Sequence, residues 1–193
     1  MKPSYKLAAL VIMIIFVVAC TPVKQEPVQN FTLSSSNYAV HPQKSVSRKT
    51  LLLNSVTASS AYETNRMMYL KAPFYLRSFV NHRWVAPPAE MLQAMIGQAL
   101  LSRHFFRAVV FSPFAGTADY LLSVHLISLQ QEFLEPQSQE RLALRVTLID
   151  ERTNRVIDEQ MYQSVLPAPG NNPYGGVIAA HKMATEMSNT IAR

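Results

Sequence analysis

The chain has 193 residues, of which 49% are hydrophobic and 16% are charged, a balance typical of a folded globular protein rather than a disordered one. Its formal net charge is +6 at pH 7, but the basic residues are scattered instead of forming a block, so no nucleic acid is expected as a partner. Once the first 19 residues are set aside, the remaining length suits one domain with a core of its own.

The first 19 residues have the pattern of a secretory signal peptide. Lys2 and Lys6 precede the apolar run LAALVIMIIFVVA at residues 7–19, which ends at the only cysteine, Cys20. The run is too short for a membrane-spanning helix, which needs about 20 apolar residues, and it suits the apolar region of a signal peptide. Val17-Val18-Ala19-Cys20 looks like the lipobox read by the bacterial lipoprotein signal peptidase.

We therefore predict a signal peptide at 1–19, cleavage before Cys20 and a diacylglyceryl group on its sulfur. Two alternatives are an ordinary cleaved signal that happens to contain a cysteine, or a short anchor helix. Firm attachment requires two or more acyl chains, because one alone binds only marginally. A lipidated Cys20 would leave the mature chain with no free thiol, no disulfide and no cysteine metal ligand.

Residues 20–36 are predicted to be the lipidated cysteine and a flexible tether, since this segment is polar and holds two prolines and three consecutive serines. The domain is predicted to span 37–193. Its first half reads as a short edge strand at 38–40, a strand at 51–56 buried on both faces, and a pair of strands at 67–71 and 74–81.

A helix is predicted to start at Pro87-Pro88, with an apolar stripe at regular helical spacing formed by Met91, Leu92, Met95, Ile96, Ala99 and Leu100. Strands at 106–112, 119–133 and 141–150 follow in expected meander order. Residues 151–154 form a turn, and 155–165 return as a strand.

A proline-rich loop at 167–173 precedes a last helix, which is expected to begin near Gly176. Its predicted packing face is Val177, Ala180, Ala184, Met187 and Ile191. The predicted fold class is α+β: a two-layer sandwich in which two helices pack on one face of a mostly antiparallel or mixed β-sheet.

No catalytic, cofactor-binding or metal-binding motif is evident, so no catalytic residue, cofactor or metal is predicted. Asp119 and His125 share a strand face, but six residues of strand separate them by about 20 Å, too far for a catalytic pair. Gly175-Gly176 could bind an anion through free backbone N–H groups or could serve as the turn that leads into the last helix.

Two constellations remain as candidate sites, each with two interpretations. Arg83 and Trp84 form a partner contact, or the tryptophan fills the junction between sheet and helix. The aromatic residues of the strand pair line a lipid-binding groove, or they pack across the strands within the core: Tyr69, Phe74, Tyr75 and Phe79.

The segment RWVAPPAEML at 83–92 resembles the R-W-x-x-P-P-x-x-[ML]-L signature of the ABC-type transport auxiliary lipoproteins, the PqiC-like group. ADYLL at 118–122, LRVTLID at 144–150, PAP at 167–169 and GGV at 175–177 are similar to later segments of that family. The similarity covers nearly all of 37–193, in the same order and after a lipobox.

The resemblance implies a non-catalytic periplasmic lipoprotein with a sheet-and-helix fold. Its implied partners are an MCE-domain protein and the permease and ATPase of an ABC transporter that moves lipids between the inner and outer membranes. The resemblance is also compatible with a homo-oligomer. Because Thr21 rather than aspartate follows Cys20, resemblance to known lipoproteins predicts the periplasmic face of the outer membrane. The alternative function is a lipoprotein scaffold for another envelope machine, such as cell-wall synthesis or lipopolysaccharide assembly.

Overall fold

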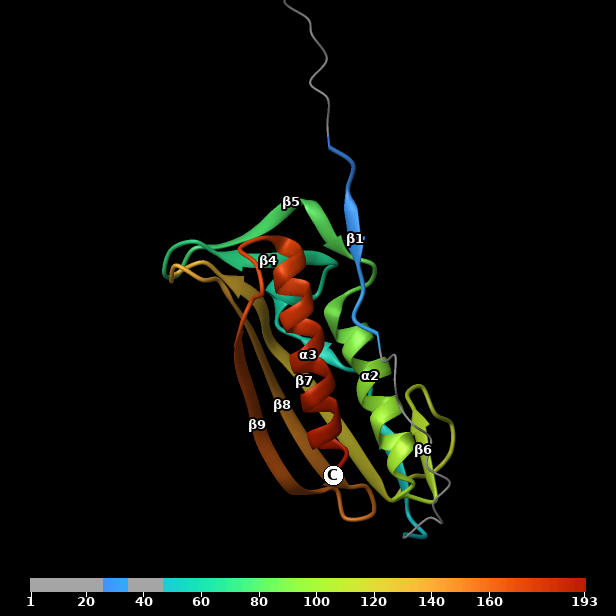
Figure 1. The fold of residues 1–193 in the computed structure, drawn as a ribbon. Helices are drawn as coiled ribbons and strands as arrows, with labels where there is room; N and C mark the ends of the chain where they lie inside the picture. The colour runs from blue at the N-terminus through green and yellow to red at the C-terminus, as the bar shows by residue number, and fades with distance from the viewer. Residues whose placement is uncertain (1–25, 35–46) are drawn as a thin grey trace, which may run out of the picture.

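The computed structural model describes residues 26–34 and 47–193. Cys20 and the strand expected at 38–40 lie outside the described residues. Figure 1 shows the elements in space. In chain order they are β1 (Gln29–Phe31), β2 (Thr50–Leu53), β3 (Thr57–Ala58), the 3₁₀ turn η1 (Ser60–Tyr62), β4 (Arg66–Leu70), β5 (Leu76–Trp84), α2 (Pro88–Arg103), β6 (Ala108–Phe111), β7 (Tyr120–Glu132), β8 (Gln139–Asp150), β9 (Arg155–Pro167) and α3 (Pro173–Ile191).

The sheet is built around the long strand β7. One edge of β7 pairs along its whole length with antiparallel β8, which in turn pairs with antiparallel β9. The other edge pairs in succession with β2, β3 and β4, all parallel to it. The predicted α+β class with a mixed sheet is confirmed, and the chain from β7 to β9 forms the expected meander.

The prediction that the strand at 106–112 neighbours the strand at 119–133 in the meander is wrong. β6 does not pair with β7, because β2 lies between them and is parallel to both. Leu51 and Leu53 of β2 are almost completely buried. A short strand with apolar residues on both faces is stable at the centre of a sheet, where neighbours on either side take up its backbone hydrogen bonds.

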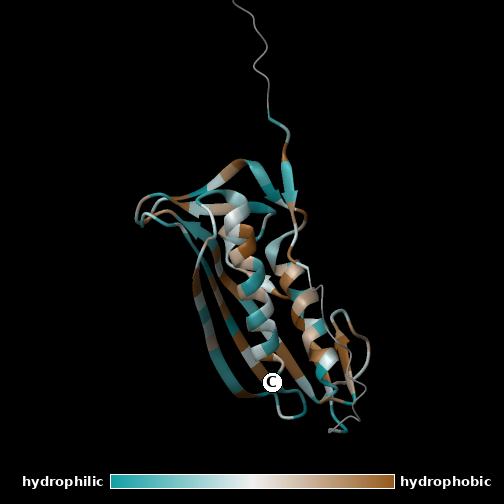
Figure 2. Cartoon of the chain, viewed as in Figure 1, coloured by the Kyte–Doolittle hydropathy of each residue, from teal (hydrophilic) through white to brown (hydrophobic). Residues whose placement is uncertain are grey.

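Both helices cover the same face of the sheet and lie beside each other (Figure 1). The predicted stripe of α2 is buried throughout, and so is the predicted face of α3 except for half-buried Ile191. In Figure 2 hydrophobic and hydrophilic residues alternate along the strands, as expected for a sheet with one covered face.

The last helix begins at Pro173, three residues before the expected start. Asn172 caps it, since its side-chain oxygen accepts the backbone N–H of Gly175 at 2.8 Å. Proline at the first helical position needs no hydrogen-bond acceptor, and it therefore belongs to the helix rather than to the preceding loop.

Part of the predicted tether belongs to the fold. β1 pairs with the end of β5 in parallel, with Phe31 opposite Trp84. Leu33 is 4% exposed, and its backbone N–H lies 3.4 Å from the sulfur of Met91. The fold thus includes residues that precede the expected boundary at 37. The apolar residues of this segment are Val28, Phe31 and Leu33, which are too few and too scattered to mark a strand.

The predicted strand pair is confirmed as the antiparallel hairpin β4–β5, with Leu70 opposite Leu76. Its second strand starts at Leu76 instead of residue 74. Phe74 has φ 65°, a left-handed conformation that ends the extended backbone. Residues 71–75 form the exposed connection of the hairpin.

Candidate functional site

Arg83 and Trp84 end β5 and face opposite ways. Trp84 is 2% exposed and belongs to the core cluster, and its backbone N–H donates to the carbonyl of Asn65 at 2.8 Å. Arg83 is exposed. The tryptophan therefore fills the junction between sheet and helix, which was one of the two interpretations, and only Arg83 is available on the surface to a partner.

The prolines that follow complete this junction. The N–H of Val85 donates to the carbonyl of Phe31 at 2.8 Å, and Pro87 then forms the N-cap of α2 with Pro88 at its first turn. The fixed φ of proline suits a helix start, and neither residue has an N–H that would need an acceptor there. The segment at 83–92 thus directs the chain from the sheet to its covering layer.

The four aromatic residues of the hairpin divide into two groups. The rings of Tyr69 and Phe79 lie 4.5 Å apart and both contact Phe133, so this half-buried group packs across the strands. Phe74 and Tyr75 lie at the hairpin tip and are exposed. Cross-strand packing is the correct interpretation for the first group and does not describe the second.

None of the pockets described for residues 26–34 and 47–193 is lined by these rings. The most apolar described pocket, of about 220 Å³, lies instead near the C-terminal ends of α2 and α3, where its walls include Leu100, Phe105, Phe106 and Ile191. Pockets that enclose a small molecule usually measure about 300 Å³ or more. We therefore assign no ligand to it.

The structure gives Asp119 and His125 separate partners. Asp119 forms an ion pair with Lys49 at 2.9 Å and accepts the backbone N–H of Thr50. The two ring nitrogens of His125 lie 2.8 and 3.2 Å from the hydroxyls of Thr57 and Ser59. These contacts attach the β2–β3 segment to β7. Asp119 and His125 therefore have a structural role.

Within the described part of the chain, no three His, Cys, Asp or Glu side chains are arranged to hold a metal ion. The same residues include no helix with the length and hydropathy that crossing a bilayer requires.

A buried acid, Glu140, was not singled out in the sequence. It is 3% exposed and lies opposite Gln131 in the β7–β8 ladder, beneath the first turn of α3. Burial, together with the negative charge of Glu132, raises the pKa of Glu140 well above its ordinary value. The raised pKa favours the neutral form of Glu140, and a neutral carboxyl can donate a hydrogen bond.

The glycine pair of α3 permits this close approach. A Cβ on Gly176 would lie 2.7 Å from Oε1 of Gln131 and 3.0 Å from Oε2 of Glu140. The N–H groups of Gly175 and Gly176 donate to the side chain and the backbone carbonyl of Asn172. Because both donors are occupied, the pair acts as a point of close packing and not as an anion site.

Replacing Glu140 with glutamine is expected to stabilise the protein by about 2 kcal/mol at pH 8, because it removes a buried carboxyl whose charged form is disfavoured in the folded state. Because the pKa of Glu140 is raised in the folded state, its contribution to the free energy of unfolding is complete below the unfolded pKa near 4.5. That contribution is lost as pH rises through the folded pKa. Thermal unfolding of E140Q and wild type from pH 4.5 to 8 measures the difference, which should grow with pH.

Glu132 is the matched control. Arg141 contacts it through two nitrogens at 2.7 and 3.0 Å, and this pairing lowers the pKa of Glu132. Its contribution is present above its unfolded pKa and is lost as pH falls through the folded pKa. E132Q should therefore destabilise the protein at pH 8. A pH-independent effect of E140Q would contradict the raised pKa of Glu140.

A family model described as ABC-type transport auxiliary lipoprotein component matches residues 31–192, from within β1 to the end of α3. The chain belongs to this family. The match starts at Phe31, in agreement with the docking of β1 against β5. A transport auxiliary lipoprotein is a membrane-anchored component of the cell envelope that associates with an ABC transport system.

Solved structures share the fold of this auxiliary lipoprotein. The crystal structure of protein XCC0632 from Xanthomonas campestris is similar with a TM-score of 0.73 and 15% identity, over 84% of this chain and 91% of that chain. A crystal structure described only as an uncharacterized protein has a TM-score of 0.67 and 14% identity, over 87% and 98% of the two chains. At these identities the likeness concerns the fold alone. No curated protein sequence matches the chain.

Proposed function

We propose that this chain is a non-catalytic subunit of an ABC/MCE-type system that moves lipids between the inner and outer membranes, anchored through Cys20 at the periplasmic face of the outer membrane. The observation that carries the proposal is the family match over residues 31–192, which extends from the last residue of β1 through all later strands and both helices. The lipobox before Cys20 supports the anchor, and Thr21 at the next position supports outer-membrane sorting.

The domain offers partner proteins an exposed strand. β9 pairs with β8 on one edge only among the described strands, and its first half is exposed on both faces. Val156, Ile157 and Met161 are large apolar residues with more than half of their surface exposed. An unpaired edge with apolar side chains can accept a strand or an apolar surface from another chain.

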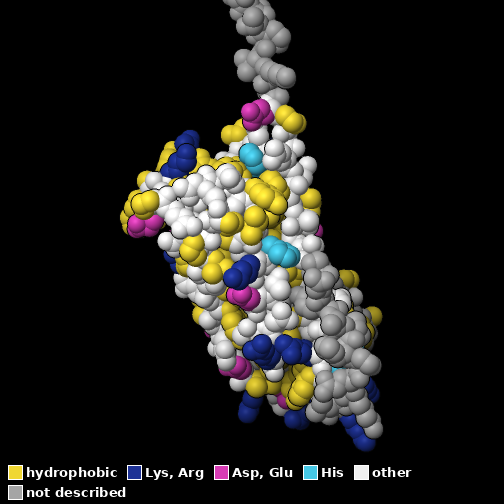
Figure 3. Space-filling view, viewed as in Figure 1, with side chains coloured by type: hydrophobic (Ala, Val, Ile, Leu, Met, Phe, Trp, Pro, Cys, Tyr) yellow, Lys and Arg dark blue, Asp and Glu magenta, His cyan; other side chains and the backbone are white. Residues whose placement is uncertain are grey.

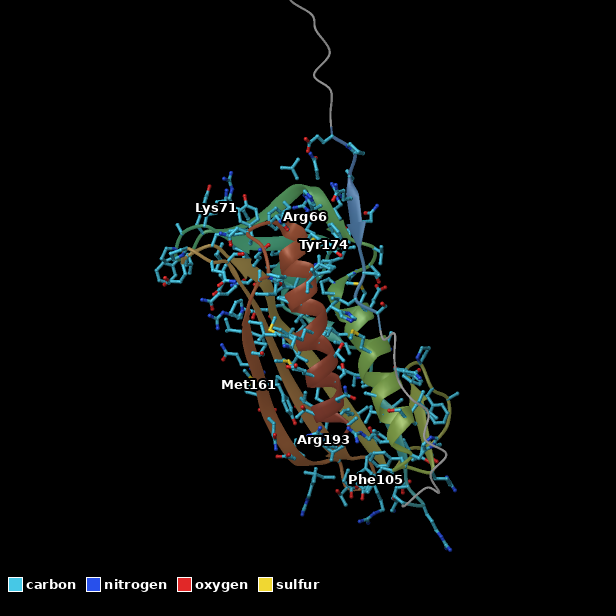
Figure 4. All side chains as sticks on the ribbon, viewed as in Figure 1. Arg66, Lys71, Phe105, Met161, Tyr174 and Arg193 are labelled. Carbon is cyan, nitrogen blue, oxygen red and sulfur yellow. The ribbon has the colours of Figure 1, made fainter. Side chains whose placement is uncertain are left out.

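In vivo photo-crosslinking tests the proposal. A crosslinking amino acid is introduced at Arg83, the predicted contact, at Met161 on β9 (Figure 4), and at exposed Leu101 of α2 as a control. Each variant keeps the fold because the replaced side chain is exposed. We expect an MCE-domain protein or a subunit of its ABC transporter to be captured from Arg83 or Met161 and not from Leu101.

Capture of cell-wall or lipopolysaccharide assembly proteins from the same positions, with no MCE or ABC component, would instead support the alternative scaffold function. Capture of a second copy of this chain from Met161 would identify β9 as a homo-oligomer contact and would leave the MCE partner to the Arg83 position.

A further inference from the structure

The tip of the β4–β5 hairpin is exposed to an extent that folding of the single chain does not explain. Residues 71–75 are all exposed, and the exposed fraction of Phe74 is 103%, so no described residue covers its ring. Phe74 also holds φ 65°, a strained conformation for a residue with a side chain. A strained, uncovered aromatic residue points to a contact outside the chain.

The tip continues into a surface of apolar and basic side chains on β5. We define the head surface as Lys71, Phe74, Tyr75, Arg77 and Val80. The exposed fraction of Val80 is 81%, and the guanidinium of Arg77 lies 5.1 Å from the centre of the Tyr75 ring. In the described chain the outer edge of β5 is paired only at residues 82–84, by β1. The head surface is therefore open.

The charge of this hairpin has one sign. Residues 66–84 include Arg66, Lys71, Arg77 and Arg83 and no aspartate or glutamate. The neighbouring turn between β7 and β8 adds one acid, Glu135, together with partly exposed hydrophobic residues. Figure 3 shows hydrophobic and basic side chains beside each other at this upper end of the molecule. Aromatic rings with arginine and lysine around them match the interface of a bilayer that contains anionic lipids.

The position of the anchor directs the same end toward a membrane. This step rests on the proposed lipidation of Cys20. Six residue steps separate Cys20 from Glu26, the first described residue, and they span at most about 20 Å. β1 follows directly and pairs with β5, so the anchor holds this end near the lipid. Figure 1 shows β1, β4 and β5 at one end of the molecule and the C-terminus at the other.

We infer that the head surface contacts the membrane that holds the lipid anchor: Phe74 and Tyr75 enter the headgroup region, and Lys71 and Arg77 bind lipid phosphates. A lipid surface suits these residues better than a protein partner because Phe74 lies on a projecting turn and not in a groove. The acyl chains of Cys20 supply the affinity, and the hairpin determines the orientation of the domain. β9 and Arg83 are then left free for other subunits.

Depth-dependent quenching tests this contact. Full-length lipidated protein is reconstituted into vesicles of phosphatidylethanolamine and phosphatidylglycerol. Phe74→Cys and Phe105→Cys each supply one free thiol for an environment-sensitive dye, because the only native cysteine carries the lipid. Phe105 is the matched control, an exposed aromatic residue at the opposite end (Figure 4). At position 74 we expect a blue-shifted emission that nitroxide-labelled lipids quench, and at position 105 neither effect.

Water-like emission at position 74 in vesicle-bound protein would overturn the inference while leaving the proposed anchor intact. A blue shift that nitroxide lipids do not quench would also overturn it, because a protein such as a second copy would then cover the tip. Loss of the protein from the vesicle pellet would instead contradict the anchor at Cys20, and with it the orientation assumed here. Quenching that weakens in vesicles of phosphatidylcholine alone would support the assigned role of Lys71 and Arg77.

Discussion

Replacing Trp84 with alanine is expected to lower the free energy of unfolding by about 4 kcal/mol. The ring is 2% exposed and lies in the core cluster at the point where the sheet passes into α2. Truncation would remove a large apolar surface and leave a cavity between β5, β1 and the helix layer. Thermal or denaturant unfolding of the domain measures the loss.

Arg83→Ala is the matched control, since its side chain is exposed one position earlier in the same strand. It should change stability by no more than about 0.5 kcal/mol. Trp84→Phe should fall between the two variants, because phenylalanine refills part of the cavity. Unchanged melting of Trp84→Ala would contradict the core position of the ring. A loss of crosslinked partner at full stability would restore the contact interpretation of Trp84.

Replacing Cys20 with serine is expected to move the protein from the membrane to the soluble periplasmic fraction. A serine hydroxyl cannot form the thioether to diacylglycerol, and the acyl chains supply most of the affinity for the bilayer at about 0.8 kcal/mol per buried CH₂. The variant is exported behind an ordinary cleavable signal, so that an unprocessed signal peptide cannot itself retain it. Fractionation followed by an alkaline wash measures the membrane-bound share.

The attachment site can be read directly in the wild type. Digestion after Lys24 releases the peptide 20–24, whose mass should include the lipid. Thr21→Asp is the control that keeps the thiol: it should remain membrane-bound but sort to the inner membrane, by resemblance to known lipoproteins. Persistence of Cys20→Ser in the washed membrane, or an unmodified 20–24 peptide in the wild type, would contradict the anchor.

The predicted elements agree with the structure wherever periodicity extends over several turns or residue pairs. The stripes of α2 and α3 and the hairpins of β7, β8 and β9 follow the spacing of their apolar residues. Agreement is poorer where the signal is short. Val28, Phe31 and Leu33 are isolated apolar residues in a polar stretch, and only the parallel pairing with β5 shows that β1 belongs to the sheet.

In the candidate site, too, the sequence predicted some features and missed others. The segment at 83–92 stood out in the sequence, but the pattern did not distinguish a buried Trp84 from an exposed one. Glu140 did not stand out, because a single acid in a strand usually faces solvent. Its burial depends on the first turn of α3, which arrives from 33 residues further along the chain, at Pro173.

The amino-acid order alone predicted the signal peptide and the lipid attachment, and it determined the family resemblance and the apolar faces of both helices, since each depends on neighbouring residues. Tertiary structure decided that β2 separates β6 from β7, that Trp84 is internal and that Phe74 is uncovered. Local periodicity reports which side of an element is apolar. Which distant element covers that side, or leaves it open to a membrane, depends on pairing and packing between residues far apart in the chain.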